Sequence, residues 1–421
     1  MALTLKRSGS YESRSMIRPL TAADVSLIPR LLASDSHDPA EAERASRPMI
    51  ESLFPQLFLN TPHAQPDIHG LASLGEDGQL MGMIGTVMRQ MQFRDRPIRA
   101  AVSAELFVDP AHRSKMLGVK LFKQVMDGPQ DLSFSDIAND SSRTLWQSLG
   151  GTVASWYGLN WLKVIRPGLL PLSMLSKSRL GRPIAWAGRP LAMLTDNLLR
   201  RAAGKFCQLN AVAKVQAEPL TPELFLQYFP QFGRADDLRP IYDRETIDWV
   251  WPRLDFMYRN GGASQQVLLR SARGEPIGWY IYQLSEVGIA RVSQIVAHPH
   301  TAGQVIDHLW NHAAERGAVA VAGRIIPRFV QAISDRHCLM LRRSTYLLVH
   351  SRDPEITESF LNGRAFLSLL EGEGPLQIWN NPTVALKRLQ QQNASQDNAT
   401  LRRAGWRQPP GYHPETQPPG G

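Results

Sequence analysis

The chain has 421 residues, of which 43% are hydrophobic and 20% charged, and its formal net charge at pH 7 is +9. This composition excludes a wholly disordered chain and fits two or three domains of ordinary size. Cys207 and Cys338 are far apart and lack metal-ligand spacing, which argues against a disulfide scaffold or zinc site and favours a reducing compartment. The positive charge would suit nucleic acid, an anionic membrane or an acidic substrate. Because no paired Cys/His ligands or aromatic RNA-binding run accompany it, we expect no nucleic-acid partner and no metal.

Both ends of the chain have the composition of unfolded segments. Residues 1–15 are polar and rich in Ser and Arg, and they predict a flexible arm. Residues 389–421 are rich in Gln, Asn and Arg and then in Pro and Gly, and they predict a disordered tail. The start of the chain lacks the apolar run of a signal peptide, and no uncharged stretch is long enough to cross a membrane. We expect a cytoplasmic protein, while its oligomeric state stays open.

Residues 16–166 predict a first α/β unit. Asp77-Gly78 lies between two apolar runs, a signal for a β-hairpin, and Gly150-Gly151 predicts the end of a helix. The expected elements are a strand from Met16, helices at 22–32 and within 39–58, a hairpin over 70–87, strands at 98–108 and 132–135, a helix at 141–149 and closing strands within 152–164.

One run, residues 101–122, combines a strand, a polar turn and the start of a helix. The backbone N–H groups and the dipole at such a helix start can bind a phosphate. Arg113 and Lys115 lie beside the turn and could neutralise the anion, and Gly118 would let the backbone approach it closely. A purely structural αβ corner has the same pattern.

The segment Val108-Asp-Pro-Ala-His-Arg-Ser-Lys-Met-Leu-Gly118 resembles the acyl-CoA pyrophosphate loop of the GNAT (Gcn5-related N-acetyltransferase) superfamily, whose pattern is Arg/Gln-x-x-Gly-x-Gly/Ala after a Val-x-Pro turn. Arg113 fills the first position and Gly118 the last, but Met116 stands where the family has its middle glycine. The segments 16–24 and 139–151 resemble the family's opening strand and a later helix. The resemblance covers roughly residues 16–165.

The resemblance implies an acyl-CoA co-substrate, acetyl-CoA or another acyl-CoA, and no metal. It assigns Phe107 and Val108 to the pantetheine and thioester through their backbone. It assigns Asn139 to the pantetheine, although an ordinary helix N-cap is an equal alternative. It also assigns the loop and helix start to the pyrophosphate: Arg113, Ser114, Lys115, Met116, Leu117, Gly118 and Val119.

The reaction that the resemblance implies also needs acid–base groups. Glu105, three residues before Val108, is close to where the family often has its general base, and a solvent-facing strand carboxylate is the alternative. Trp146 stands where the family has the tyrosine that protonates the leaving thiolate. Because indole cannot serve as that acid, Tyr157 becomes the replacement candidate.

Residues 167–216 are rich in Pro and Arg and predict a linker with a helix at 191–203. A basic amphipathic segment on a membrane surface, through 167–205, is the alternative, which the prolines disfavour because they interrupt a long apolar face. Residues 217–388 repeat the order helix, hairpin, strand, proline turn and helix. They resemble a second, degenerate GNAT-like domain that lacks the phosphate loop. The predicted fold class is therefore α/β (α+β), with two GNAT-like domains, each a mixed central sheet flanked by helices.

The resulting prediction is a GNAT-type N-acyltransferase that moves an acetyl or other acyl group from CoA to a small-molecule or glycan amine. An amino sugar of a cell-surface polysaccharide is the acceptor suggested by analogy. The first alternative is a non-catalytic binding or regulatory protein, favoured by Met116 and Trp146. The second is a ligase-like transferase that uses aminoacyl-tRNA, favoured by the positive charge.

Overall fold

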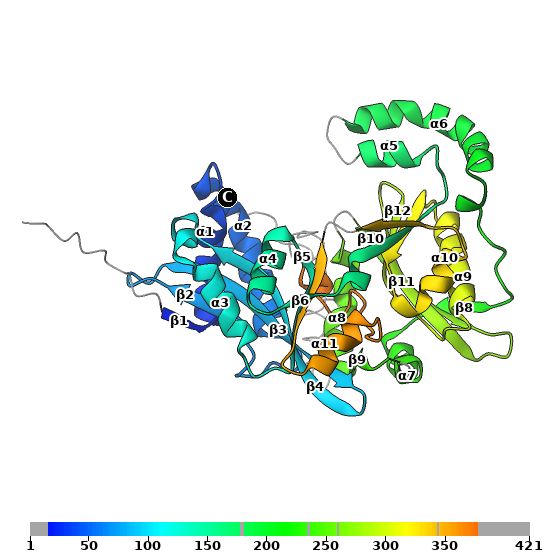
Figure 1. Ribbon diagram of the computed structural model, residues 1–421. Coiled ribbons are helices and arrows are strands. Elements are labelled where there is room, and N and C mark those ends of the chain that lie inside the picture. Colours follow the sequence, from blue (N-terminus) through cyan, green and yellow to red (C-terminus); the bar gives the residue numbers. More distant parts are fainter. Residues whose placement is uncertain (1–15, 177–180, 234–235, 259–260, 343–344, 378–421) are drawn as a thin grey trace, which may run out of the picture.

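The computed structural model of the protein describes residues 16–377, except 177–180, 234–235, 259–260 and 343–344. The predicted arm (1–15) and tail (389–421) lie outside the described residues. The described chain forms two mixed β-sheets with helices packed around them, as Figure 1 shows. The predicted fold class, an α/β protein with two mixed sheets flanked by helices, is confirmed.

The first sheet begins with four antiparallel strands. Its order is β1 (Met16–Pro19), β2 (Leu71–Leu74), β3 (Leu80–Phe93), β4 (Arg96–Val108), β5 (Leu132–Ala138), β15 (Tyr346–His350) and β6 (Thr152–Val153), and β9 (Leu238–Pro240) pairs with β3. β4 and β5 are parallel, and β5 pairs antiparallel with β15. The predicted turn between β2 and β3 places Gly78 at φ +77°, a conformation that glycine adopts without strain.

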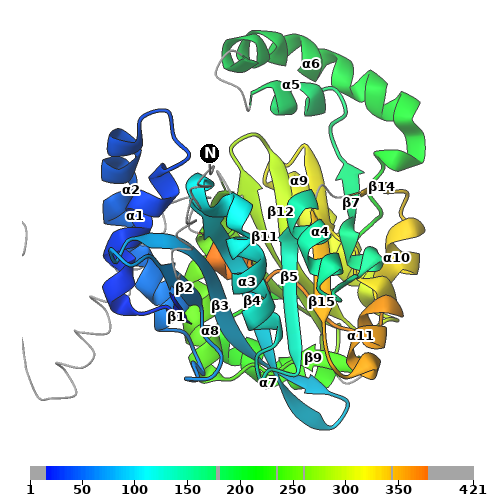
Figure 2. The same ribbon diagram turned by 60° about the vertical axis from the view of Figure 1, so that its left-hand side comes forward.

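Helices cover both faces of this sheet because its strands carry apolar side chains on both sides. η1 (Ala22–Leu27), α1 (Ile28–Ala33) and α2 (Pro39–Phe54), which continues into η2 (Pro55–Leu59), pack in the core that contains Met83, Val87 and Met91 of β3. α3 (Leu117–Met126) and α4 (Asp140–Ser148) pack in a second core with Met81 and Ile84. Figure 2 shows α3 and α4 near the centre of the view, in front of the strands, and α1 and α2 at the left.

Read from β8 to β14, the second sheet has the same succession of antiparallel and parallel strand pairs as the first. Its order is β14 (Leu339–Arg342), β7 (Leu159–Val164), β13 (Ala320–Arg324), β12 (Ile289–Ala297), β11 (Pro276–Ser285), β10 (Gly261–Arg270) and β8 (Gln216–Pro219). β12 and β13 are the parallel pair. The helices in this part of the chain are α7 (Pro222–Phe232), α8 (Arg244–Val250), α9 (Ala302–Glu315), α10 (Val330–Ser334) and α11 (Pro354–Leu361), of which α11 lies next to the β3–β4 hairpin of the first sheet. The Thr221 side chain caps α7 by accepting a hydrogen bond from Leu224 N. The degenerate-copy interpretation of this half stays a prediction.

The two halves exchange strands. β7 follows β6 in the chain but pairs with β13 and β14 in the second sheet, while β15 enters the first sheet between β5 and β6. The predicted boundary at residue 166 therefore does not separate the two sheets. Pairing between strands that follow one another in the chain can be expected from the sequence. A strand that pairs with the sheet of the other half has no local sequence signal.

The segment 167–216 differs from the predicted linker. It contains α5 (Leu170–Leu175) and a long helix, α6 (Gly181–Ala203), which begins ten residues before the predicted start at 191. Pro183 lies in the first turn, where proline is tolerated, and Pro190 removes one hydrogen bond from a helix that continues past it. The prolines thus do not interrupt the helix. None of the helices in the described ranges combines the length and the apolar character needed to span a bilayer.

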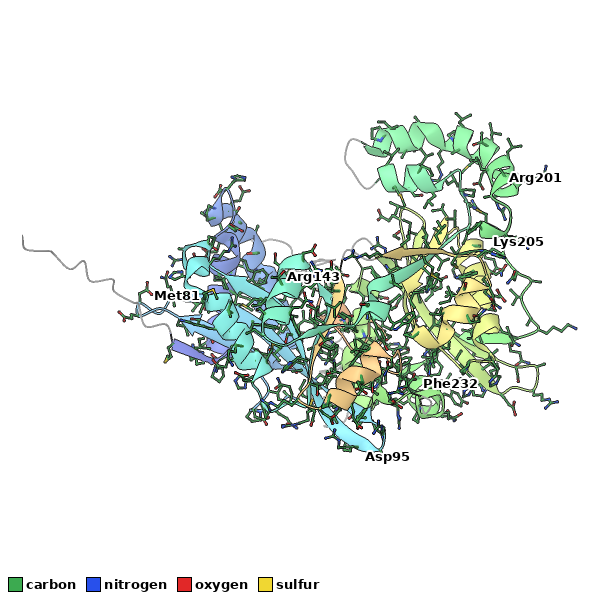
Figure 3. All side chains as sticks on the ribbon, viewed as in Figure 1. Met81, Asp95, Arg143, Arg201, Lys205 and Phe232 are labelled. Carbon is green, nitrogen blue, oxygen red and sulfur yellow. The ribbon has the colours of Figure 1, made fainter. Side chains whose placement is uncertain are left out.

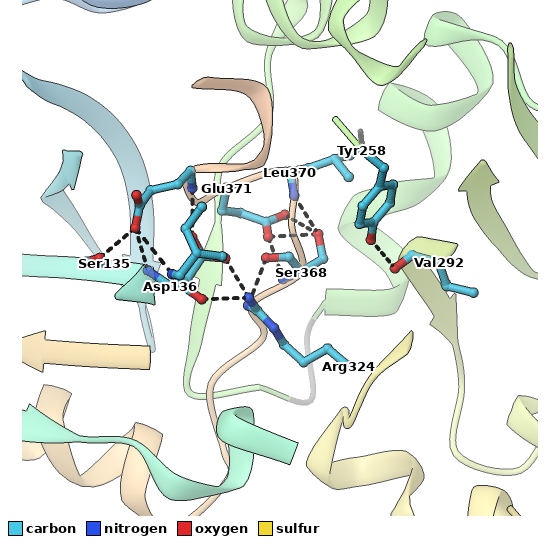
Figure 4. A network of polar contacts seen from close by, with 10 residues as sticks. Ser135, Asp136, Tyr258, Val292, Arg324, Ser368, Leu370 and Glu371 are labelled. Carbon is cyan, nitrogen blue, oxygen red and sulfur yellow. Dashed lines mark hydrogen bonds and ion pairs between the residues drawn. The ribbon is translucent and has the colours of Figure 1, made fainter. Parts of the chain in front are cut away.

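The C-terminal part of the fold, residues 365–376, runs through the interior between the sheets. Leu369 N donates to Ser293 O of β12, and Arg324 of β13 donates to Ser368 O. The segment therefore lies where β12 and β13 diverge beyond their pairing at Arg291 and Ala322. Figure 4 shows the polar network around it, in which Arg324 Nη2 donates to Asp136 Oδ2 of β5 at 2.7 Å. This buried ion pair joins the two sheets.

Candidate functional site

The candidate site lies where β4 and β5 separate. The parallel ladder between them covers Ala100–Val102 and Leu132–Phe134 and then stops, although both strands continue to Val108 and Ala138. A bulge at the same point shifts the pairing of β4 with β3, and Glu105 at the bulge has φ +55°. The backbone of β4 beyond Val102 is thus turned away from β5. Such a separation leaves main-chain groups available to a ligand.

A cavity of about 260 Å³ fills this separation. Its wall combines the bulged part of β4 with β5, α3, α4 and the C-terminal segment. The side chains that matter for chemistry are Glu105, Ser135 and Glu373, and the rings of Phe107 and Trp146 supply apolar surface. The lining is the mixture of apolar surface and a few polar groups that ligand sites usually show.

A second cavity of about 430 Å³ reaches the same strand from the side of α1 and α2. Its wall contains Leu32 and Ala33 of α1 and Ala42 and Ser46 of α2, together with Glu105 and Phe107. The two cavities therefore share two residues of β4. A molecule in each would meet at the half-buried carboxylate of Glu105.

The predicted phosphate loop forms η3 (Pro110–Lys115), followed directly by α3. Met116 has φ +58° and ψ +24°, the left-handed conformation that the family's glycine would favour, and its side chain is 59% exposed. The substitution of methionine for glycine thus keeps the turn, and the side chain points to solvent rather than into the protein. The methionine side chain therefore does not narrow the loop.

The start of α3 leaves first-turn amide groups for a ligand. As far as the described residues go, Met116 makes no side-chain capping bond, and the first helical bond at this end is Lys120 N to Met116 O. A Cβ at Gly118 would meet only Val108 Cγ2 at 3.4 Å, an ordinary contact. None of the described neighbours therefore requires glycine there, and its missing side chain leaves the backbone open to the approach of a ligand.

The predicted cation beside the loop is held in a surface pair. Arg113 Nη2 lies 3.0 Å from Asp35 Oδ2, and its Nε donates to Val108 O at 3.3 Å. Both side chains are mostly exposed, so this ion pair is weak and can be exchanged for a phosphate. The backbones of Ser114 and Lys115 belong to η3, but their side chains are outside the described features.

The structure adds a residue that sequence reasoning missed, Glu373 on the C-terminal segment. Its Oε1 accepts hydrogen bonds from Ser135 Oγ at 2.5 Å, Asp136 N at 3.1 Å and Ile137 N at 3.3 Å. Burial, followed by the charge of Asp136, raises the pKa of Glu373 to about 8, and the charge of Glu105 contributes in the same direction. A carboxyl group whose surroundings favour its protonated form therefore lines the same cavity as Glu105. The alternation Glu371-Gly372-Glu373-Gly374 was the one signal in the sequence.

The glycine before Glu373 explains how the segment comes so close to β5. A Cβ at Gly372 would lie 2.3 Å from Asp136 Oδ1, so only glycine fits beside that carboxylate. Glu373 N then donates to Asp136 Oδ1 at 2.8 Å. This hydrogen bond and the close approach of Gly372 to Asp136 together fix Glu373 at the floor of the cavity.

Tyr157 is not among the residues that line this cavity. Its ring is buried in the main core, and its hydroxyl donates to Ala365 O of the C-terminal segment. Burial raises the pKa of Tyr157 far above its usual value, so the group stays a structural donor. The prediction that Tyr157 donates a proton to the leaving thiolate is therefore corrected: the described structure places its hydroxyl on Ala365 O, outside the cavity. Sequence spacing could not show that the ring faces the core.

Asn139 and Trp146 both line the cavity. Asn139 caps α4 by accepting from Ser142 N at 2.9 Å, which is one of the two alternatives stated for it, and its assignment to the pantetheine stays a prediction. Trp146 is buried, its ring centroid 4.9 Å from that of Phe122. It supplies wall rather than a proton.

No family model matches the sequence, and none of the curated proteins matches it. Among solved structures, the chain is similar to a GCN5-related N-acetyltransferase from Kribbella flavida (14% identity, 82% of this chain and 73% of that chain, TM-score 0.46). It is also similar to a GCN5-related N-acetyltransferase from Anabaena variabilis (12%, 81% and 74%, TM-score 0.49). A third is N-myristoyltransferase from Saccharomyces cerevisiae, solved with bound myristoyl-CoA (10%, 82% and 79%, TM-score 0.44). These similarities are too distant to transfer a reaction, so the function is argued from the cavities themselves.

Proposed function

We propose that the protein is an N-acyltransferase that moves an acyl group from CoA to an amine. The observation that carries the proposal is the meeting of two cavities at Glu105 and Phe107, one under α3 and α4 and one under α1 and α2. Group transfer between two bound molecules needs such a shared point, because the reacting atoms must be held within van der Waals distance. A protein that only binds one ligand has no need of it.

The acyl-CoA would occupy the cavity between β4 and β5. Its pyrophosphate would bind the first-turn amides Leu117, Gly118 and Val119, with Arg113 released from Asp35 to neutralise charge. The unpaired stretch of β4 around Phe107 and Val108 would bind the pantetheine through main-chain groups. A backbone N–H there would stabilise the oxyanion of the thioester carbonyl. Ser114 and Lys115 remain in the proposed phosphate loop.

The two carboxyl groups divide the proton transfers between them. The amine nitrogen attacks the thioester carbonyl carbon, a C–N bond forms and the C–S bond breaks. Glu105, which lines both cavities, takes the proton from the amine. Glu373, protonated at neutral pH, gives its proton to the departing thiolate in place of Trp146 and Tyr157. A carboxyl group whose raised pKa keeps its proton at neutral pH is suited to the role of general acid.

The acceptor would enter from the cavity under α1 and α2. The small side chains of Ala33, Ala42 and Ser46 leave width there, and the lining is largely apolar apart from Glu105. A primary amine on a carbon chain or ring fits this description. An amino sugar, as suggested by analogy, is one member of that class, and acetyl is the first acyl group to test.

The proposal is tested by thiol release from acetyl-CoA with a panel of aliphatic amines, amino sugars and peptides. For Glu105→Gln, we expect a fall in kcat of roughly 10²–10⁴-fold with CoA affinity unchanged within about twofold, because a general base acts only in the transition state. Glu76→Gln, in the exposed β2–β3 turn, is the matched control and should keep full activity.

A pH profile separates the two carboxyl groups. Activity should fall as pH rises through about 8, because Glu373 then loses the proton that it donates. Glu373→Gln should remove this fall and lower the maximal rate, whereas Glu105→Gln should keep the fall. If CoA binds but no amine releases thiol, the non-catalytic alternative stands instead.

A further inference from the structure

The α5–α6 hairpin projects from the end of the second sheet in both views (Figures 1 and 2). Along α6 runs an apolar stripe, defined here as Ile184, Ala187, Leu191, Leu194 and Leu198, at alternating spacings of three and four residues. This spacing puts the five side chains on one face of the helix. Ile184 is 61% exposed, Leu191 68%, Leu194 80% and Leu198 71%, so the face is not covered within the described chain.

The orientation of α6 is fixed from its other side. Asp196 Oδ1 accepts a hydrogen bond from Gly168 N at 2.9 Å, and a Cβ at Gly188 would lie 3.3 Å from Leu172 Cδ2 of α5. Ala185 and Ala192 lie on that same side and are buried or half-buried. Small residues thus let α6 pack closely on α5 while its largest apolar residues stay outside. Rotation of the helix to bury the stripe would break these contacts.

The hairpin is also the most basic part of the chain. Residues 167–206 contain seven basic residues and one acidic residue, a net charge of +6 out of the +9 of the whole chain. The acidic residue, Asp196, is 7% exposed and accepts the hydrogen bond from Gly168 N. Figure 3 shows Arg201 at the C-terminal end of α6 and Lys205 just beyond that end. The hairpin therefore carries a large positive net charge, and its one acidic side chain is buried.

We propose that the α5–α6 hairpin docks on the surface of an anionic phospholipid bilayer, with the apolar stripe of α6 among the acyl chains. An interfacial helix combines a large apolar face with Lys and Arg on its polar side, and anionic headgroups attract the latter. A second copy of the chain is a poorer occupant, because two hairpins of charge +6 repel each other. A nucleic acid would leave the four large apolar side chains in water.

The hairpin lies apart from the cavity of the proposed reaction, so this proposal stands whether or not the chain transfers acyl groups. It is tested by co-sedimentation of the full chain with vesicles of phosphatidylcholine alone and with roughly 30% phosphatidylglycerol. We expect binding to the anionic vesicles only, and weaker binding as salt is raised. The emission of Trp186, which is 80% exposed, should shift to shorter wavelength on binding.

Three variants locate the binding face. Leu191→Asp/Leu194→Asp should weaken vesicle binding at least tenfold, since two leucine side chains would no longer be buried among the acyl chains. Arg200→Gln/Arg201→Gln should weaken binding to anionic vesicles by several-fold. Leu361→Asp is the matched control, because Leu361 is 42% exposed at the end of α11, outside the hairpin, and binding should not change. Melting temperatures of all three should match the parent, since the replaced side chains are exposed.

Several results would overturn the proposal. One is a wild-type chain that does not bind anionic vesicles at low salt. Another is a Leu361→Asp variant whose binding is weakened as much as that of Leu191→Asp/Leu194→Asp. Binding that survives the loss of both leucines would show a purely electrostatic attraction. A concentration-dependent dimer that the leucine substitutions dissociate, with no vesicle binding, would show that a second copy covers the stripe.

Discussion

Met116 is a single residue on which the state of the phosphate loop depends. It holds φ +58°, a conformation that costs a non-glycine residue about 1 kcal/mol or more, and its side chain makes the loop no narrower. The sequence indicated a departure from the family's loop, but not that the backbone would keep the glycine conformation. Backbone dihedrals of a loop depend on both of its ends, which residue identity alone does not describe.

We predict that Met116→Gly preserves the loop and stabilises the protein by about 0.5 kcal/mol, because relief of strain exceeds the added entropy of the unfolded chain. Met116→Val should destabilise it by more than about 1 kcal/mol, since a β-branched residue is worse in this conformation. Chemical denaturation of both variants measures the difference. Equal stability of the glycine and valine variants would contradict the left-handed assignment.

Glu373 shows why part of the site could not be predicted. Its partners Ser135, Asp136 and Ile137 are more than 230 positions away in the chain. Glu105 could be proposed from the sequence because it lies on the strand that leads directly into the phosphate loop. Glu373 had no such neighbour, and only the path of the C-terminal segment brings it to β5.

The raised pKa of Glu373 also predicts how stability depends on pH. The unfolded carboxyl loses its proton near its ordinary value of 4.5, while the folded one keeps it to about 8. Deprotonation therefore favours the unfolded state, and this contribution to stability falls as pH rises from about 4.5 to about 8.

Glu373→Gln removes that dependence, because the amide oxygen still accepts hydrogen bonds but nothing titrates. The melting temperature of this variant relative to wild type should rise between about pH 5 and about pH 9. Equal pH profiles for the two proteins would show that Glu373 is already ionised in the fold.

At the scale of the elements, local signals were enough for most strands and helices. The hairpins, the capped helix α7 and the strand–loop–helix unit around α3 follow from turn residues, capping residues and apolar periodicity. α6 was underestimated because Pro190 was given more weight than the continuing pattern on both sides of it. One missing hydrogen bond does not end a helix that continues on both sides of the proline and also contacts α5.

The exchange of β7 and β15 was beyond local reasoning, and it makes a prediction about fragments. A fragment of residues 16–166 would lack β15, the strand that joins β6 to β5, and would leave β7 without β13. We expect this fragment to show no cooperative thermal transition and to bind a hydrophobic dye. The full chain, measured beside it, should unfold cooperatively, and a fragment that melts as cooperatively as the full chain would contradict the exchange.

At the scale of the whole molecule, the two sheets act as one unit. One core cluster contains side chains from both sheets, and Arg324 of β13 pairs with Asp136 of β5 at 2.7 Å in the interior. The sequence predicted two α/β halves, because each half repeats an order of elements. It could not predict how they join, since buried ion pairs between distant segments have no pattern in the sequence.

We predict that Arg324→Met costs about 3–5 kcal/mol of folding free energy, because Asp136 is left buried without its cation. Arg94→Met is the matched control, since Arg94 and Glu355 form an ion pair at 2.9 Å with both side chains more than half exposed. Its loss should cost about 0–1 kcal/mol. Urea denaturation measures both, and similar costs would contradict the role of the Arg324–Asp136 pair.

The claim on which the account rests is that the separation between β4 and β5 binds acyl-CoA, and calorimetric titration of acetyl-CoA tests it most directly. We predict a dissociation constant of about 10 µM, roughly −7 kcal/mol, for the wild type. Arg113→Ala should weaken it several-fold, and Gly118→Glu should abolish it by filling the loop with a like charge. Gly158→Glu is the control, because a side chain there meets nothing within 4 Å. No heat and no thermal shift with the wild-type protein would contradict the account.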